Sequence, residues 1–194
     1  QLGTPLSSLM GWIEYLKTTN LEASTVDEIS KDVSRLETIT DRFSKIGSEP
    51  KFEEVSVKQT IDRVIDYLRL RISDKVRISV SGDATYKHNL CVPLFEWVIE
   101  NIIKNAVDAM EGKGLLKIDL SKVDNKIIID LSDTGKGIPK KDFKKVFKPG
   151  FTSKKRGWGL GLSLVRRIVE DQHKGKIYVK TSEIDRGTSF RIEL

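Results

Sequence analysis

Asp133 begins a glycine-containing turn, residues 133–139, that follows the apolar run 127–131. The run predicts a strand, so a carboxylate stands where a strand passes into a turn. Placed there, a carboxylate can accept a hydrogen bond from an exocyclic amine of a ligand. Gly135 and Gly137 permit positive φ and a close approach of the backbone to that ligand. The same pattern is also that of an ordinary Asp–Gly turn, so its meaning depends on the segments around it.

Asn101, Asn105 and Asp108 recur at helical spacing within a predicted helix, residues 94–110, whose opposite face is apolar. Asn is a mediocre helix former, so two of them inside a helix need a reason. Oxygen atoms on one helical face can bind a hard cation such as Mg²⁺, which takes few protein ligands beside water and phosphate oxygens. The alternative is a solvated polar stripe.

A second glycine run, residues 157–162, leads into a predicted helix over 160–172 and can bind an anion through free backbone N–H groups. Just before it, residues 136–156 carry nine Lys or Arg against a single acid, Asp142, in a chain of net charge +6. This concentration of charge predicts a polyphosphate partner. Nucleic acid is the competing polyanion, although the chain has neither a base-reading helix nor a basic groove interleaved with aromatic residues.

A sheet and covering helices are needed to position these residues. The periodicity predicts helices over residues 58–73, 94–110 and 160–172. Strands are predicted at residues 55–57, 76–80, 89–92, 115–122, 126–132, 176–181 and 188–194. These elements predict an α/β sandwich, with one mixed sheet and helices on one face. The remaining segment, 134–158, is polar and long enough to be a functional lid, and we name it the lid segment.

The N-terminal part of the chain has a different pattern. Apolar residues recur every three or four positions over residues 1–18 and again over 25–46. Two such helices form a hairpin that cannot bury both apolar stripes alone, so we expect a homodimer through residues 1–47, as a four-helix bundle. The predicted fold class is therefore α+β, with an antiparallel helical hairpin (1–49) followed by the sandwich (50–194).

Composition sets further bounds. In 194 residues the one cysteine, Cys91, excludes an internal disulfide and suits a reducing compartment. No apolar run approaches the ~18 residues of a membrane span, and no signal peptide is visible. Because the chain lacks an initial Met and Gln1 opens inside an apolar pattern, we expect a piece of a longer protein. We expect it to be cytoplasmic, with any membrane anchor in segments that this chain does not contain.

Taken in order, these segments resemble the nucleotide-binding motifs of the histidine kinases and of the wider GHKL ATPase superfamily. Residues 101–109 correspond to the N box, and residues 133–139 to the first glycine box. The F box corresponds to residues 146–152 and the second glycine box to residues 157–162. The last turn corresponds to residues 187–190. Their order and spacing over residues 52–194 match that superfamily. The resemblance implies an ATP-binding domain that uses Mg²⁺.

The resemblance also implies roles for individual residues. Asp133 would bind the adenine amine, Asn105 would coordinate Mg²⁺, and Asn101 would act catalytically at the phosphates. One of the basic residues 154–156 would reach the γ-phosphate. The other implied nucleotide-binding positions are Asp108, Gly135, Gly137, Lys154, Lys155, Gly157, Gly159, Leu160, Gly161, Leu162 and Thr188.

Residues 1–6 resemble the phosphoacceptor motif His-Glu-x-x-Thr-Pro-Leu, read from its second position. The resemblance implies that the phosphorylated histidine stands immediately before Gln1 and that Thr4 positions water for phosphatase activity. Gln1 replaces the acidic neighbour that helps to deprotonate the histidine, which leaves the identity of the general base open. His88 and His173 lie outside any such motif.

The implied function is that of a histidine protein kinase core in a two-component system. Such a core transfers the γ-phosphoryl group of ATP to a histidine, for relay to an aspartate in the receiver domain of a response regulator. An ATP-hydrolysing GHKL member is an alternative, but those enzymes carry Glu at the position of Asn101 to activate water. A non-catalytic or pseudokinase dimeric scaffold is the alternative from a different class.

Overall fold

The computed structural model describes residues 3–17, 26, 29–30, 33, 50–153 and 159–194. It divides into two compact units, Gln1–Pro50 and Lys51–Leu194.

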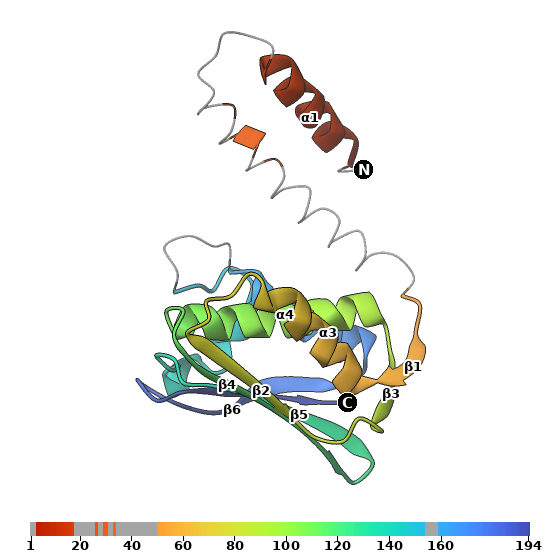
Figure 1. Ribbon diagram of the computed structural model, residues 1–194, viewed down its shortest axis with the longest axis vertical. Coiled ribbons are helices and arrows are strands. Elements are labelled where there is room, and N and C mark those ends of the chain that lie inside the picture. The colour runs from red at the N-terminus through yellow and green to blue at the C-terminus, as the bar shows by residue number, and fades with distance from the viewer. Residues whose placement is uncertain (1–2, 18–25, 27–28, 31–32, 34–49, 154–158) are drawn as a thin grey trace. The chain divides into compact units, whose positions relative to one another are not determined.

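In the first unit, helix α1 spans Gly3–Lys17, as the apolar periodicity predicts (Figure 1). Ile13 is buried against Val26 and Val33, with Leu16 at the margin of this cluster. The predicted partner helix lies mostly outside the described residues, although the described positions between 26 and 33 are helical. The hairpin therefore stays a prediction.

A five-stranded mixed sheet forms the base of the second unit. Its order is β2-β4-β5-β7-β6, with β2 and β4 parallel and the other neighbours antiparallel. The prediction of a single sheet is wrong in one respect, because strands β1 and β3 form a separate antiparallel pair. The strands are β1 Glu53–Ser56, β2 Val76–Ser81, β3 Lys87–Leu90, β4 Gly114–Val123, β5 Lys126–Asp133, β6 Lys176–Glu183 and β7 Gly187–Glu193.

Helices cover one face of this sheet (Figure 1). They are α3 Val57–Arg69, α4 Val92–Ala109, α5 Gly161–Arg167 and the π-helix η3 Ile168–Gln172. Two 3₁₀ turns, η1 Lys140–Asp142 and η2 Lys145–Phe147, lie within the lid segment. Among the described helices, none combines the length and apolar character needed to cross a bilayer.

Local sequence explains most of these boundaries. The β4–β5 hairpin turns at Asp124 and Asn125, whose φ values of 47° and 66° are those that two-residue hairpin turns require. Helix α3 begins at Val57, which the sequence pattern placed in a strand, because the Ser56 hydroxyl accepts the N–H of Gln59 at 3.3 Å and caps the helix. The predicted helix over 160–172 is α-helical only to Arg167, after which it widens into η3.

The core lies between the sheet and the helices. Side chains alternate along a strand, so Ile127, Ile129 and Leu131 of β5 all face the helices. They meet fully buried residues of α4, which include Phe95, Ile99, Ile102 and Ile103. The same alternation carries Asp133 onto the covered face, where its side chain is only 7% exposed.

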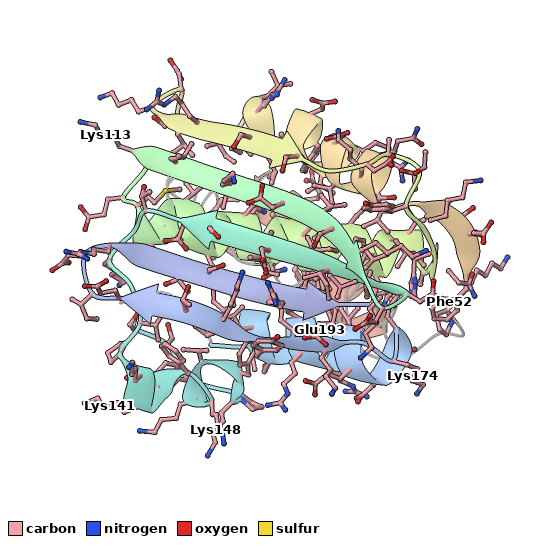
Figure 2. All side chains as sticks on the ribbon, turned by 90° about the horizontal axis from the view of Figure 1, so that it is seen from below. Phe52, Lys113, Lys141, Lys148, Lys174 and Glu193 are labelled. Carbon is pink, nitrogen blue, oxygen red and sulfur yellow. The ribbon has the colours of Figure 1, made fainter. Side chains whose placement is uncertain are left out.

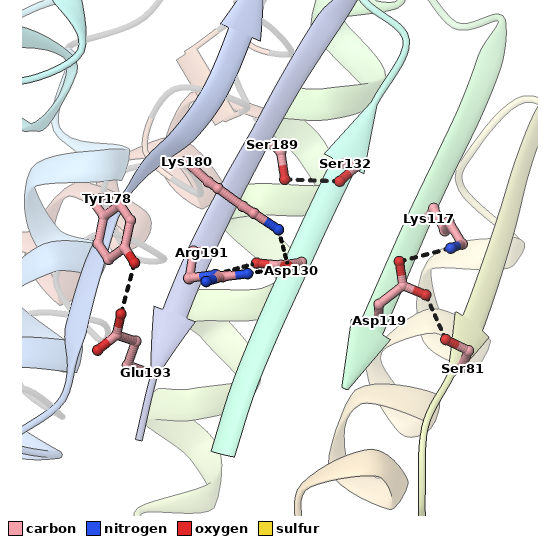
Figure 3. Close-up of polar contacts among 10 residues, drawn as sticks. All are labelled: Ser81, Lys117, Asp119, Asp130, Ser132, Tyr178, Lys180, Ser189, Arg191 and Glu193. Carbon is pink, nitrogen blue, oxygen red and sulfur yellow. Dashed lines mark hydrogen bonds and ion pairs between the residues drawn. The ribbon is translucent and has the colours of Figure 1, made fainter. Parts of the chain in front are cut away.

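The other face of the sheet is open and polar (Figures 2 and 3). Asp130 accepts two hydrogen bonds from the Arg191 guanidinium and one from Lys180, each at 2.7 Å. Burial acts to raise the pKa of Asp130, but the hydrogen bonds from Arg191 and Lys180 outweigh it and lower this pKa. The charges on this face therefore pair with one another across the strands.

Ile129→Ala is expected to lower the free energy of unfolding by about 3 kcal/mol, because it opens a cavity at a fully buried position. Ile184→Ala is the matched control, since Ile184 is 53% exposed and its loss should change the free energy by less than about 0.5 kcal/mol. Urea unfolding followed by circular dichroism measures both. Equal losses for the two variants would contradict the assignment of the core.

Candidate functional site

The Asp133 carboxylate lies at the C-terminal end of β5 and is bound by backbone N–H groups. Its Oδ1 atom accepts the N–H of Gly135 at 2.8 Å and the N–H of Thr188 at 3.3 Å. Within the described part of the chain, no further hydrogen bond reaches this carboxylate. Oδ2 is therefore available to a donor on a ligand.

Burial raises the pKa of Asp133, while the N–H groups of Gly135 and Thr188 act in the opposite direction. Desolvation thus outweighs the two hydrogen bonds. A buried carboxylate with an open oxygen gains stability when a ligand supplies another donor. The site is accordingly arranged to receive an N–H or O–H group.

Two glycines allow the turn after Asp133 to fit between α4 and β7. A Cβ atom at Gly135 would lie 2.6 Å from the carbonyl carbon of Ala109, the last residue of α4. Gly187, at the start of β7, has φ of +112°, and a Cβ atom there would overlap the carbonyl oxygen of Asp133. The N–H of Lys136 also donates to the carbonyl of Ala109 at 3.0 Å. The turn is therefore attached to the end of α4.

Ser182 ties the same turn to the β6–β7 hairpin, and the sequence had not identified it. Its hydroxyl accepts the N–H of Ile138 at 2.7 Å and donates to the carbonyl of Gly187 at 2.9 Å. It also lies 2.9 Å from the Thr188 hydroxyl. A β-bulge between Val179 and Thr181 shifts the register of β6, so Ser182 shares the side of Thr188.

A pocket of about 380 Å³ opens beside Asp133 and Thr188. Its lining combines Asp133 and Thr188 of the covered face with Ser132 and Ser189, which bond to each other on the open face (Figure 3). Its lining residues are Ser132, Asp133, Thr181, Ser182, Glu183, Arg186, Gly187, Thr188 and Ser189.

Helix α4 connects the Asp133 turn to the second glycine run. Asn101 and Asn105 are half-buried along it, whereas Asp108 is exposed. The Asn101 amide donates to the carbonyl of Trp97 at 3.2 Å, and a Cβ atom at Gly161 would lie 2.9 Å from Asn101 Oδ1. Ala109 lies eight positions after Asn101, a distance of about 12 Å along a helix. One helix thus contacts both glycine segments, the first at its C-terminal end and the second near its middle.

The second glycine run is described from Gly159 onward. Residues 159–162 are half-buried, Leu160 is the N-cap of α5, and Gly161 is its first residue. The N–H of Gly150 donates to the carbonyl of Gly159 at 3.1 Å and closes the base of the lid segment. The Phe147 side chain of the lid segment is buried, and its ring packs edge-on to that of Phe190, with 6.1 Å between the ring centroids.

Five lysines of the lid segment lie on or beside η1 and η2 with exposed side chains: Lys140, Lys141, Lys144, Lys145 and Lys148. Lys141 and Lys148 extend outward at one edge of the unit (Figure 2). No contact joins these five to Asn101 or Gly161 in the part of the chain that the structure describes. The expectation that the basic cluster meets a polyphosphate stays a prediction.

Several predicted site residues lie elsewhere or outside the described residues. Lys154, Lys155, Arg156 and Gly157 are not among the described residues, and Thr4 lies in α1 with its side chain likewise not described. Over the described residues, no group of three or more His, Cys, Asp and Glu side chains could hold a metal ion. Amide oxygens such as that of Asn105 fit a cation that takes most of its ligands from phosphate and water.

The family model described as histidine kinase-, DNA gyrase B-, and HSP90-like ATPase matches residues 92–194. Sensor histidine kinase ZraS of Escherichia coli (strain K12) is 37% identical over 208 residues, which covers 100% of this chain and 43% of ZraS. Sporulation kinase A of Bacillus subtilis (strain 168) is 28% identical over 200 residues, which covers 99% of this chain and 32% of that kinase.

The chain thus spans less than half the length of either curated relative. Among solved structures, histidine kinase ThkA in complex with response regulator protein TrrA is similar, with a TM-score of 0.70 and 25% sequence identity. That similarity covers 98% of this chain and 57% of the other.

Asp133→Asn is expected to raise the free energy of unfolding at neutral pH, because Asn keeps an acceptor for the two N–H groups without burying a charge. The raised pKa means that the folded wild type binds the proton more tightly than the unfolded chain, so its stability falls as pH rises through that pKa. The advantage of the variant should therefore grow from about pH 4 to about pH 7.

Urea unfolding of both proteins at stepped pH values measures this difference. A variant that is less stable than the wild type at pH 7 would show that the two N–H groups require a charged acceptor.

Proposed function

Because the chain belongs to the histidine kinase-, DNA gyrase B-, and HSP90-like ATPase family, we propose that it is the core of a histidine protein kinase and binds Mg-ATP. The single observation that carries this proposal is the pairing of two sites along α4. Asp133, with an open carboxylate oxygen, lies at the C-terminal end of α4, and the Asn101–Gly161 contact lies near the middle of the helix.

Adenine is the base that suits the first site. An ionised carboxylate only accepts hydrogen bonds, so Oδ2 of Asp133 would accept from the exocyclic amine of adenine and repel a carbonyl oxygen at that position. Thr188 would lie beside the ring, since its N–H already shares the Asp133 carboxylate.

The phosphates would lie toward Asn101 and the second glycine run. The half-buried backbone of residues 159–162 and the Asn101 amide would bind phosphate oxygens. Asn105 would contribute an amide oxygen to Mg²⁺, which when bound would neutralise charge on the phosphates. Lys154 or Lys155 would reach the γ-phosphate.

The acceptor would be a histidine of the N-terminal hairpin, from which the phosphoryl group passes to the receiver domain of a response regulator. The similarity to ThkA, solved in complex with TrrA, supports that partner. Within α1, the apolar side chains Leu9, Met10, Trp12 and Tyr15 are exposed. A second copy of the hairpin would cover them, which supports a homodimer through residues 1–47.

Calorimetric titration of the chain with ATP in the presence of Mg²⁺ is expected to show binding, and Asp133→Asn should weaken it about 10- to 100-fold. The loss follows because the variant presents an N–H group where the amine needs an acceptor, and a hydrogen bond to a charged group contributes about 1.5–3 kcal/mol. Asp130→Asn is the matched control, since Asp130 lies on the same strand but on the open face. Equal affinity for Asp133→Asn and wild type would remove Asp133 from the nucleotide site.

Incubation of the 194-residue chain with ATP labelled in its γ-phosphate is expected to give no phosphohistidine. Its only histidines are His88 and His173, and the ring nitrogens of buried His173 are already engaged. A longer chain that carries the proposed acceptor ahead of Gln1 should become labelled. Acid-labile label on the 194-residue chain itself would contradict the assignment of the acceptor.

A further inference from the structure

His173 follows η3 directly and links two elements of the proposed nucleotide site. It is 6% exposed, and both of its ring nitrogens are engaged. The backbone N–H of Cys91 donates to Nε2 at 3.2 Å, and Nδ1 lies 3.0 Å from the carbonyl of Ile168. Because a backbone N–H can only donate, Nε2 must accept, and the ring proton is on Nδ1.

The neutral ring is the form that this environment favours. Burial lowers the pKa of His173, and the nearby His88 lowers it further by charge repulsion, while the hydrogen bond to Ile168 acts in the opposite direction. A protonated ring would point an N–H group at the N–H of Cys91. The Cys91–His173 hydrogen bond therefore exists only with the neutral imidazole.

One end of this link is the start of α4. Cys91 is the N-cap residue of α4, and its own side chain caps no N–H group. The imidazole is thus the side chain that fixes the backbone where α4 begins. Asn101 lies ten residues further on, about 15 Å along the helix.

The other end of the link is η3, which continues α5 from Gly161. Ile168 accepts from both the backbone N–H of His173, at 3.1 Å, and its Nδ1–H. The wider π-turn of η3 thereby directs the ring at Cys91. Helix α4 packs against both α5 and η3, so the link joins the two elements that meet at Asn101 and Gly161.

Two aromatic rings pack against the imidazole. Phe52 lies edge-on to it at 5.5 Å and Phe95 of α4 lies at 5.9 Å. Phe52 is the second residue of the second unit, and it lies at the same end of the sheet as Lys174, which follows His173 (Figure 2). This packing excludes water from the Cys91–His173 hydrogen bond, which strengthens it.

We propose that His173 is a positioning residue, which holds the start of α4 against the end of η3 and thereby sets the position of Asn101 against Gly161. The expected effect of His173 on nucleotide affinity rests on the proposed function. A packing role alone would require only a ring of this size. The positioning role requires an acceptor at the place of Nε2.

Two substitutions separate these roles, because Gln places an acceptor near Nε2 whereas Asn places a donor near Nδ1. In the 194-residue chain, His173→Gln should keep the hydrogen exchange of the Cys91 amide and the Asn101 side-chain NMR signals close to wild type. His173→Asn should accelerate that exchange about tenfold and shift the Asn101 signals. Mg-ATP affinity should fall about tenfold in His173→Asn and less than about twofold in His173→Gln.

Asp130→Asn is the control, since Asp130 pairs with Arg191 on the open face of the sheet, and it should leave all three measurements unchanged. If His173→Gln and His173→Asn lower the melting temperature alike and do not differ in Cys91 exchange, His173 only packs and the proposal fails. If the wild type does not bind Mg-ATP but the exchange and the Asn101 signals separate the variants as expected, the proposed function fails and the positioning role stands.

Discussion

The buried carboxylate of Asp133 is the group on which the second unit's site depends. Two N–H groups, from Gly135 and Thr188, bind one of its oxygens, so the turn after β5 and the start of β7 must meet at this point. Gly135 and Gly187 leave room for that meeting against Ala109 and the Asp133 carbonyl. Because burial disfavours the charge, the fold gives up stability here to keep an acceptor oxygen available.

Two aspartates of β5 show how position in the sheet decides chemistry. Asp130 and Asp133 are three residues apart, so the alternation of the strand sends them to opposite faces. Asp130, on the open face, is neutralised by Arg191 and Lys180 (Figure 3). Asp133, on the covered face, receives only backbone N–H groups from the described residues. The same side chain thus becomes part of a surface ion pair in one place and a ligand acceptor in the other.

Helix α4 connects the separate parts of the site. Its C-terminal end contacts the Asp133 turn, Asn101 contacts Gly161, and His173 fixes the residue before its first turn. A helix is stiff over such distances, so a constraint at its start reaches Asn101 without rearranging the residues between. The apolar side of α4 packs on the sheet, which leaves its asparagines at the margin of the core.

The sequence by itself determined the order of the elements and predicted a mixed sheet with helices on one face. It also placed Asp133 at the end of a strand, Asn101 within a helix and the described glycines in turns. These follow from periodicity and turn chemistry, which are local. Only the tertiary structure decided the contributions of Ser182 and His173 and the outward direction of the lysines on η1 and η2. A β-bulge reorients Ser182, a π-helix directs His173, and both act on partners far away in sequence. Local patterns cannot specify such contacts, because they depend on which elements pack together.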